Sequence, residues 1–305
     1  WLVTGEEQPL AVAARASAGS AAAEAMALAL ALAKHYGLVR ADLAELGYQQ
    51  GWAMPNRPSL GGLWKQQGAA LAASALAQLT SVGDPLSQPL PELIEQAFGI
   101  DVAVQPLGEG FDGLAVSTDD LKLILASPQP VPARLRFTIA HELGHLLASD
   151  DQQIHADKDI YRTEGGESEV RANAFAACLL MPEETLRERV VPGFSKEDFC
   201  ALATQLKVSP RALAIRLEDL RFIDAGTRHR WDRFTGGDAA RIAGLSTRHA
   251  QMAAESLSIR PPGLLLRDAW AAYEAGDITL RLVANLLGTS TDTLRAQLAE
   301  AEVDD

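Results

Sequence analysis

Two histidines four residues apart, inside one long apolar segment, constrain the fold of this chain more than any other feature. His141 and His145 enclose Glu142 in the pentapeptide HELGH, and the surrounding stretch RFTIAHELGHLL repeats apolar residues at helical spacing. We therefore expect a helix from about Ala133 to Ser149. Residues four apart lie on the same face of a helix, so both imidazoles can reach a single point. Because the segment is apolar, this helix is expected to lie in the interior.

The spacing of these residues predicts a zinc site. Two imidazoles one turn apart can bind one ion at the usual zinc–nitrogen distance of about 2.0–2.1 Å. Glu142 points about 100° away from its neighbour on the helix. It can therefore act as the catalytic general base toward a water molecule without being a metal ligand itself. Two surface histidines on an exposed helix are the alternative, and the apolar surroundings argue against it.

A third metal ligand is expected from another element, since catalytic zinc sites usually have three protein ligands. Glu169 is the main candidate, because it begins a predicted helix from about Glu167 to Leu180. The small side chains of Ala172 and Ala176 lie on its face, which would allow two helices to approach closely. Glu167 is the rival, on a different side of the same helix. The residues alone leave both glutamates open.

Residues near these ligands have weaker assignments. Asn173 is one turn after Glu169 and either supports a metal ligand by a hydrogen bond or fills a core or capping position. His155 and Tyr161 lie in the loop between the two helices; a role in stabilising an oxyanion is weighed against a surface loop, and they are not assigned to the site. Core positions are predicted for Phe175, Leu179 and Leu180.

Charge and cysteine content exclude several classes of function. The 305 residues carry a net charge of −13, of which −10 falls within residues 91–195. An acidic surface repels phosphate backbones, so we expect no nucleic-acid binding by this chain alone and a basic protein as partner. Cys178 and Cys200 are predicted to be buried and unpaired. The apolar run from Ala21 to Ala33 is too short to span a bilayer, and a cytoplasmic location without membrane contact is expected.

The remaining sequence predicts a mainly helical α+β protein. Helices are expected in the alanine-rich stretches from Pro9 to Gly37 and from Trp64 to Ser81, and short helices after Ser195. Three runs of β-forming residues, DVAVQPL, FDGLAVSTD and LKLILAS, predict a small antiparallel sheet packed on the HExxH helix. We expect a helical N-terminal region at 1–89, a zinc peptidase core at 90–192 and a helical C-terminal region at 193–305. Two stretches of that last region have a helix-turn-helix outline, which the acidic charge makes a weak indication of DNA binding.

The stretch RFTIAHELGHLL, followed by ESEVRANAFAACLLMP, resembles the ImmA/IrrE family of bacterial metallopeptidases. The resemblance covers about residues 90–225 and includes Phe137, Thr138 and the HELGH pentapeptide, followed by E, x, x, A, N, x, F, A and the closing LLMP. It implies a gluzincin-like core, with His141, His145 and Glu169 as ligands of Zn²⁺ and Glu142 as the catalytic residue. The first residues, WLVTGEE, also resemble the end of a Cro/cI-type helix-turn-helix domain, which would then lie upstream.

The same resemblance implies a function. Family members typically cleave a partner transcriptional repressor in response to stress, and so relieve repression. We therefore expect a zinc-dependent endopeptidase whose substrate is a helix-turn-helix repressor. The alternative is a zinc-bearing regulator, or an antitoxin-like partner, that binds a transcription factor without cutting it. The complete HExxH motif favours the enzyme.

Overall fold

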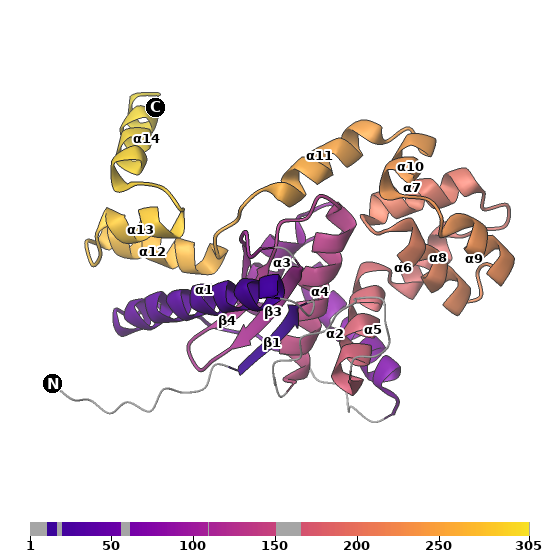
Figure 1. Cartoon of the computed structure of the whole chain (residues 1–305), viewed down its shortest axis with the longest axis horizontal. Coiled ribbons are helices and arrows are strands. Elements are labelled where there is room, and N and C mark those ends of the chain that lie inside the picture. Colours follow the sequence, from indigo (N-terminus) through magenta and orange to yellow (C-terminus); the bar gives the residue numbers. More distant parts are fainter. Residues whose placement is uncertain (1–10, 17–19, 56–61, 109, 151–165, 305) are drawn as a thin grey trace.

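Figure 1 shows the computed structural model of the chain, which describes residues 11–16, 20–55, 62–108, 110–150 and 166–304. The protein is mainly helical with one small sheet, so the predicted α+β class is confirmed. The first part contains the sheet and the helices that cover it: β1 (Ala11–Ala16), α1 (Ser20–Glu45), α2 (Trp64–Val82), α3 (Leu90–Phe98), β2 (Asp101–Val104), β3 (Phe111–Ser117), β4 (Lys122–Ala126), α4 (Pro132–Ala148) and α5 (Glu167–Leu180).

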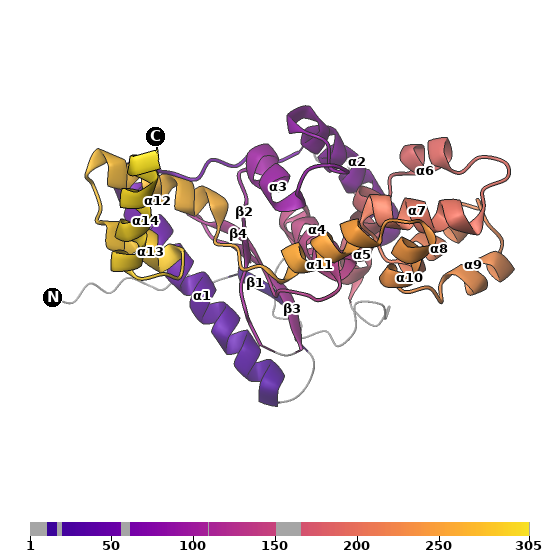
Figure 2. The same cartoon turned by 90° about the horizontal axis from the view of Figure 1, so that it is seen from above.

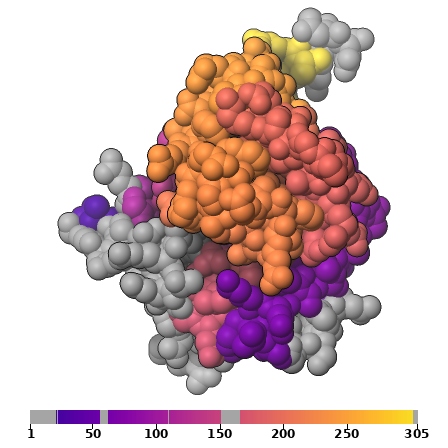
Figure 3. Space-filling model, turned by 90° about the vertical axis from the view of Figure 1, so that its right-hand side faces the viewer, coloured from indigo at the N-terminus to yellow at the C-terminus, as the bar shows by residue number. Residues whose placement is uncertain are grey.

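The rest of the described chain is helical, as predicted. Its elements are α6 (Glu183–Arg189), α7 (Lys196–Leu206), α8 (Pro210–Asp219), α9 (Ala225–Trp231), α10 (Gly236–Ile242), α11 (Ser246–Leu257), α12 (Gly263–Ala275), α13 (Leu280–Leu286) and α14 (Thr291–Asp304). Helices α7 to α10 contact one another, and Figure 3, which views the molecule from their side, shows them above α2. Within the described parts of the chain, no helix has both the length and the apolar character of a bilayer-spanning segment.

The sheet has four strands in the order β1-β3-β4-β2. Strands β3 and β4 form the expected antiparallel pair, but β2 runs parallel to β4, with Val102 opposite Ile124. The prediction of a purely antiparallel sheet was therefore wrong for one pair. The physical reason is the connection between β2 and β3, which leaves room for β4 to lie between these two strands. The short spacing of the three runs favoured a sheet in which neighbouring strands follow one another in sequence.

The first alanine-rich stretch is not one helix. Residues Ala11–Ala16 form β1, antiparallel to β3 with Val12 opposite Val116, and α1 begins only at Ser20. Alanine favours helix in isolation, but pairing with a free sheet edge satisfies the backbone groups and outweighs a propensity difference of less than about 1 kcal/mol per residue. The helix predicted from Trp64 to Ser81 is confirmed as α2.

The two faces of the sheet belong to two separate hydrophobic cores. Alternate residues of β3 and β4 point to opposite faces. Ala115 and Ile124 join the core that contains α2, α4, α5 and α7. Val116 and Leu123 join the core formed with α1, α12 and α13 on the other face. The first helix and the C-terminal helices therefore cover the same side of the sheet, as Figures 1 and 2 show.

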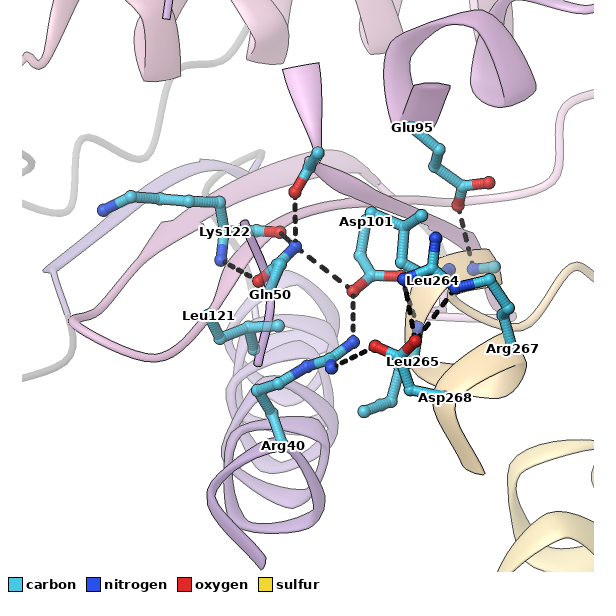
Figure 4. Close-up of polar contacts among 12 residues, drawn as sticks. Arg40, Gln50, Glu95, Asp101, Leu121, Lys122, Leu264, Leu265, Arg267 and Asp268 are labelled. Atoms are coloured by element: carbon cyan, nitrogen blue, oxygen red, sulfur yellow. Dashed lines mark hydrogen bonds and ion pairs between the residues drawn. The ribbon is translucent and has the colours of Figure 1, made fainter. Parts of the chain in front are cut away.

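A buried polar network joins these distant parts of the chain (Figure 4). Arg40 of α1 is fully buried and donates to Asp268 of α12 at 2.6 Å and to Asp101 of β2 at 3.3 Å. The other oxygen of Asp101 accepts from the backbone N–H groups of Leu264 and Leu265, in the first turn of α12, at 2.8 and 3.0 Å. Paired buried charges of this kind fix the relative position of the elements that carry them.

The cysteine prediction holds in part. No disulfide forms between Cys178 and Cys200, which are both free. Cys200 is buried as expected, whereas Cys178 is half-buried, at the surface where α5 ends. Both behave as small apolar residues that contact the same core.

Candidate metal centre

Helix α4 presents the two histidines of the HELGH pentapeptide to the interior. Pro132 begins the helix, where its missing N–H is not needed, and Ser149 ends it in the left-handed conformation. His141 is 0% exposed and His145 is 3% exposed. Their Nε2 atoms lie 2.9 Å apart. The expected sharing of one helical face is therefore confirmed.

Glu169, in the first turn of α5, completes a triangle with these rings. Its Oε2 lies 3.3 Å from Nε2 of His141, and its Oε1 lies 2.9 Å from Nε2 of His145. Ligand atoms at about 2.0–2.1 Å from one tetrahedral ion are separated by about 3.3 Å. The three donors are thus spaced as they would be around a shared ion, and two imidazoles with one carboxylate are a usual set for catalytic zinc. The residues present fit the metal.

Glu167 does not take part in this cluster. It is exposed, two residues before Glu169 on α5. Among the described residues, the only set of three or more histidines, cysteines or carboxylates close enough to hold a metal ion is His141, His145 and Glu169. The geometry therefore selects Glu169 over Glu167 as the third candidate ligand, a choice that the sequence pattern alone left open.

Small residues allow α4 and α5 to approach closely enough to share an ion. A Cβ atom built on Gly144 would lie 2.9 Å from Cδ1 of Phe175, closer than real Cβ atoms come to a neighbour. Ala172 and Ala176 of α5 are both buried. Any larger side chain at Gly144 would push α5 away, and with it the carboxylate of Glu169.

Each histidine is held by a hydrogen bond on its outer nitrogen. Nδ1 of His141 lies 3.1 Å from Oδ1 of Asn173, and Nδ1 of His145 lies 2.9 Å from Oδ2 of Asp150. Oxygens of this type accept hydrogen bonds, so the proton of each neutral ring belongs on Nδ1. Both Nε2 atoms then point lone pairs at the same region. Two lone pairs 2.9 Å apart repel each other, and a cation between them removes the repulsion.

Asp150 is itself held by a cation that sequence reasoning missed. Arg171 of α5 forms an ion pair with the second oxygen of Asp150. The guanidinium also donates to Oε1 of Gln67 at 3.3 Å and stacks over the ring of Trp64, 4.8 Å from its centroid. A chain of contacts therefore runs from α2 through Arg171 and Asp150 to His145. The only sequence signals for it are the placement of Asp150 just after α4 and of Arg171 two residues after Glu169.

The electrostatics of the cluster suit metal binding. Burial alone would raise the pKa of Glu169. While the two rings carry protons on Nε2, however, the hydrogen bonds and charges of His141 and His145 outweigh burial and hold the pKa of this carboxyl well below its usual range. A divalent cation that takes the place of these Nε2 protons would meet one ionised carboxylate and two neutral imidazoles, which is the ligand set that it requires.

Glu142 lies between the two histidines on α4 and faces the sheet. It is 1% exposed, and its Cγ atom would lie 3.3 Å from a Cβ built on Gly113 of β3. The missing side chain at Gly113 thus leaves room for Glu142 beside the histidines. Its role as general base stays a prediction.

Comparison with known proteins supports a family assignment for this part of the chain. Residues 95–218 match the family model described as an IrrE N-terminal-like domain, a peptidase family. This region is similar to the ImmA/IrrE family. The IrrE-like domain begins in α3, contains the sheet strands β2 to β4 with helices α4 to α7, and ends within α8. It includes all three candidate metal ligands and Glu142.

Two curated relatives share part of this domain. One is the radiation response metalloprotease IrrE of Deinococcus radiodurans, 36% identical over 96 residues, which are 30% of this chain and 27% of the relative. The other is the protein of the same name from Deinococcus deserti, 37% identical over 91 residues, which are 29% of this chain and 31% of the relative. The chain therefore spans about 30% of the length of these relatives.

The remaining residues considered from the sequence have different outcomes. His155 and Tyr161, weighed for oxyanion stabilisation, and the WLVTGEE segment all fall outside the residues that the structure describes. The predicted core positions Phe175, Leu179 and Leu180 are confirmed as buried. Oδ1 of Asn173 accepts a hydrogen bond from Nδ1 of His141, which agrees with the first of its two assignments.

Proposed function

We propose that this chain is a zinc-dependent endopeptidase. The observation that carries the proposal is the triangle of His141, His145 and Glu169, whose ligand atoms are 2.9–3.3 Å apart. Each imidazole is also oriented by a hydrogen bond at its Nδ1 atom. The match of residues 95–218 to a peptidase family and the names of the two Deinococcus relatives support it. A structural zinc site would use four protein ligands, whereas three leave a position for water or substrate.

The chain's own residues have defined parts in this reaction. A bound zinc ion supplies Lewis acidity, which makes water acidic enough to attack a peptide carbonyl near neutral pH. Glu142 accepts the proton of the attacking water and delivers it to the amine nitrogen of the scissile bond. Asn173 and Asp150 hold the two imidazoles in one tautomer and orientation. Arg171 holds Asp150 in place through their ion pair.

The first test measures metal content in four purified proteins by elemental mass spectrometry. Wild type, Glu142→Gln and Glu167→Ala are expected to contain about one zinc per chain, and Glu169→Ala is expected to lose most of it. Glu167→Ala is the matched control, because it removes an exposed carboxylate from the same turn of α5. Zinc retained by Glu169→Ala, or absent from wild type, would contradict the proposed ligand set.

The second test addresses catalysis directly. A cell extract is incubated with wild type or with Glu142→Gln, and newly formed protein N-termini are identified by mass spectrometry. Cleavage products should form with wild type and zinc but not with Glu142→Gln, even though that variant keeps its metal. Full zinc content without any cleavage would instead favour the non-catalytic regulator.

We further propose that the substrate is a transcriptional repressor with a helix-turn-helix domain, cleaved within a basic segment. The family resemblance supports the repressor, and the charge of −10 in residues 91–195 supports the basic segment. Cleavage should slow as ionic strength rises above about 0.15 M, where exposed charges are screened within about 8 Å. A cleavage rate independent of salt would contradict the charge argument without affecting the assignment of the metal ligands.

A further inference from the structure

A cavity of about 410 Å³ lies on the far side of the HExxH helix from the metal-site residues. It is bounded by α3, by the first half of α4 and by α11, which lies above α4 in Figure 1 and in front of it in Figure 2. Apolar side chains from all three helices form most of its wall, among them Leu90, Ile139 and Met252. This volume falls within the range of small-molecule sites, about 300–1,000 Å³.

Arg136 of α4 borders this cavity and is only 8% exposed. Its Nη2 donates to the carbonyl oxygen of Pro85 at 2.7 Å, while Nε has no hydrogen-bond partner among the described residues. Burial lowers the pKa of Arg136 to about 10, so the guanidinium is still charged at neutral pH. A buried cation with unused donors is costly unless an anion or another acceptor satisfies it.

Lys207 adds a second positive charge at the same cavity. It borders the cavity from the end of α7, and its Nζ contacts the carbonyl oxygen of Ser87 at 3.5 Å. Burial, and then the nearby cations Arg136 and Arg248, lower the pKa of its ammonium. Neither Arg136 nor Lys207 has a carboxylate within 4.0 Å in the described parts of the chain. Asp84, which does not line the cavity, acts on both cations from beyond ion-pair distance. Two cations therefore border one largely apolar cavity with no carboxylate in direct contact with either.

The other charged groups at the cavity do not supply that anion. Glu92 lies 3.4 Å from Nε of Arg260, and Glu95 binds the Nη atoms of the same arginine at 2.7 and 2.5 Å, so both carboxylates are engaged. Glu255 of α11 is exposed, and it acts on Lys207 only from beyond ion-pair distance. The positive charge facing the cavity is that of Arg136 and Lys207.

We infer that this cavity binds a small amphiphilic organic anion, namely a carboxylate with an aliphatic tail of medium length. The carboxylate would lie between Arg136 and Lys207, where charge-assisted hydrogen bonds are available. The tail would lie against Leu90, Ile139 and Met252, where burial of apolar surface is favourable. The site is distinct from the metal centre, and the inference does not depend on peptidase activity.

The test is binding of octanoate to the full chain, measured by isothermal titration calorimetry at neutral pH. Octanoate should bind, while 1-octanol, which has the same tail without the charge, should bind at least about tenfold more weakly. Acetate, which has the charge without the tail, should not bind detectably. No binding of octanoate at millimolar concentration, or equal binding of octanoate and octanol, would overturn the inference.

Two variants locate the binding site. Lys207→Asn removes the ammonium, and asparagine tolerates the left-handed conformation of this residue (φ 56°), so folding should be preserved. It should weaken octanoate binding about tenfold. Lys196→Asn, at the exposed opposite end of α7, is the matched control and should bind as wild type does.

Met252→Glu provides an independent check, because it places a carboxylate in the apolar wall from the half-buried face of α11. It should abolish octanoate binding by repulsion and by loss of apolar contact. Circular dichroism and zinc content confirm that each variant is folded. Octanoate binding that is unchanged in both Lys207→Asn and Met252→Glu would place the ligand elsewhere and overturn the inference.

Discussion

Replacing Arg40 by methionine should be among the most destabilising single changes in this protein. The guanidinium is fully buried and is the cation shared by Asp101 and Asp268, which are 0% and 7% exposed. Methionine fills much of the same volume but leaves both carboxylates without that cation (Figure 4). The two ion pairs of Arg40 join α1 to β2 and to α12, and the pair with Asp268 spans 228 residues of sequence.

The expected decrease in the free energy of unfolding follows from the burial of these ion pairs. Removing one partner of a buried ion pair costs about 3–5 kcal/mol, because an uncompensated charge is left in the interior. Arg267 offers the matched control, since its guanidinium binds the other oxygen of Asp268 at 2.7 Å but is 65% exposed at the side chain. Exposed pairs contribute about 0–1 kcal/mol, so Arg267→Met should leave the free energy of unfolding almost unchanged.

The loss of stability caused by Arg40→Met, called the deficit below, should be larger at pH 7 than at pH 5. Burial, opposed by Arg40, raises the pKa of Asp101 from its ordinary 3.8 to about 6. The folded state therefore binds more protons than the unfolded state between about pH 4 and 6, and stability falls as pH rises through that window. Without Arg40 this pKa rises further. The deficit of the variant should thus be about 1 kcal/mol smaller at pH 5 than at pH 7.

The assay is urea unfolding followed by circular dichroism, with wild type, Arg40→Met and Arg267→Met compared at pH 5 and pH 7. The expected result is a large drop in midpoint for Arg40→Met, partly recovered at pH 5, and almost no change for Arg267→Met. Equal effects of the two arginines would refute the argument from burial. A deficit that grows on acidification would refute the assigned role of Asp101.

Three further changes test other parts of the structure. Asp150→Asn should weaken zinc affinity by about 10- to 100-fold in a chelator competition, because it removes the charged partner of His145; unchanged affinity would show that Asp150 does not orient the ring. Gly68→Ala should lower the midpoint of thermal unfolding, because its Cβ would lie 2.3 Å from the backbone oxygen of Arg171, and α2 and α5 must then separate; a midpoint equal to wild type would contradict this packing. Ser195→Ala should cost about 1 kcal/mol in urea unfolding, because it removes the capping box at the start of α7, and an unchanged midpoint would mean that the cap is replaced.

The clustering of His141, His145 and Glu169 was largely predictable because its determinants are local. The spacing of His141 and His145 defines their common face once the segment is a helix, and the apolar surroundings decide that it is buried. Glu169 lies in the first turn of the next helix, so its approach depends on one close contact, at Gly144. The bounds expected for α4 and α5 agree with the structure to within one residue at each end.

The parts that could not be predicted depend on contacts between distant segments. Nothing local to Ala11–Ala16 indicates a strand; that segment becomes one because β3 offers a free edge. The same holds for the partners of Arg40, for the parallel pairing of β2 with β4, and for Arg171, whose ion pair with Asp150 requires α4 and α5 to be packed already. Sequence patterns report periodicity and spacing within a segment, not which distant segments meet.

Helices pack on both faces of the sheet, and this affects how shorter fragments of the protein will behave. A fragment limited to residues 95–218 would keep α4 on one face but would lack α1 and α12 on the other. Apolar side chains that are now 0% exposed would then face water, among them Leu114, Val116, Leu123 and Leu125. A contiguous apolar surface of this kind promotes self-association. Expression of residues 95–218 as a separate unit is therefore expected to yield aggregates unless both ends of the chain are retained.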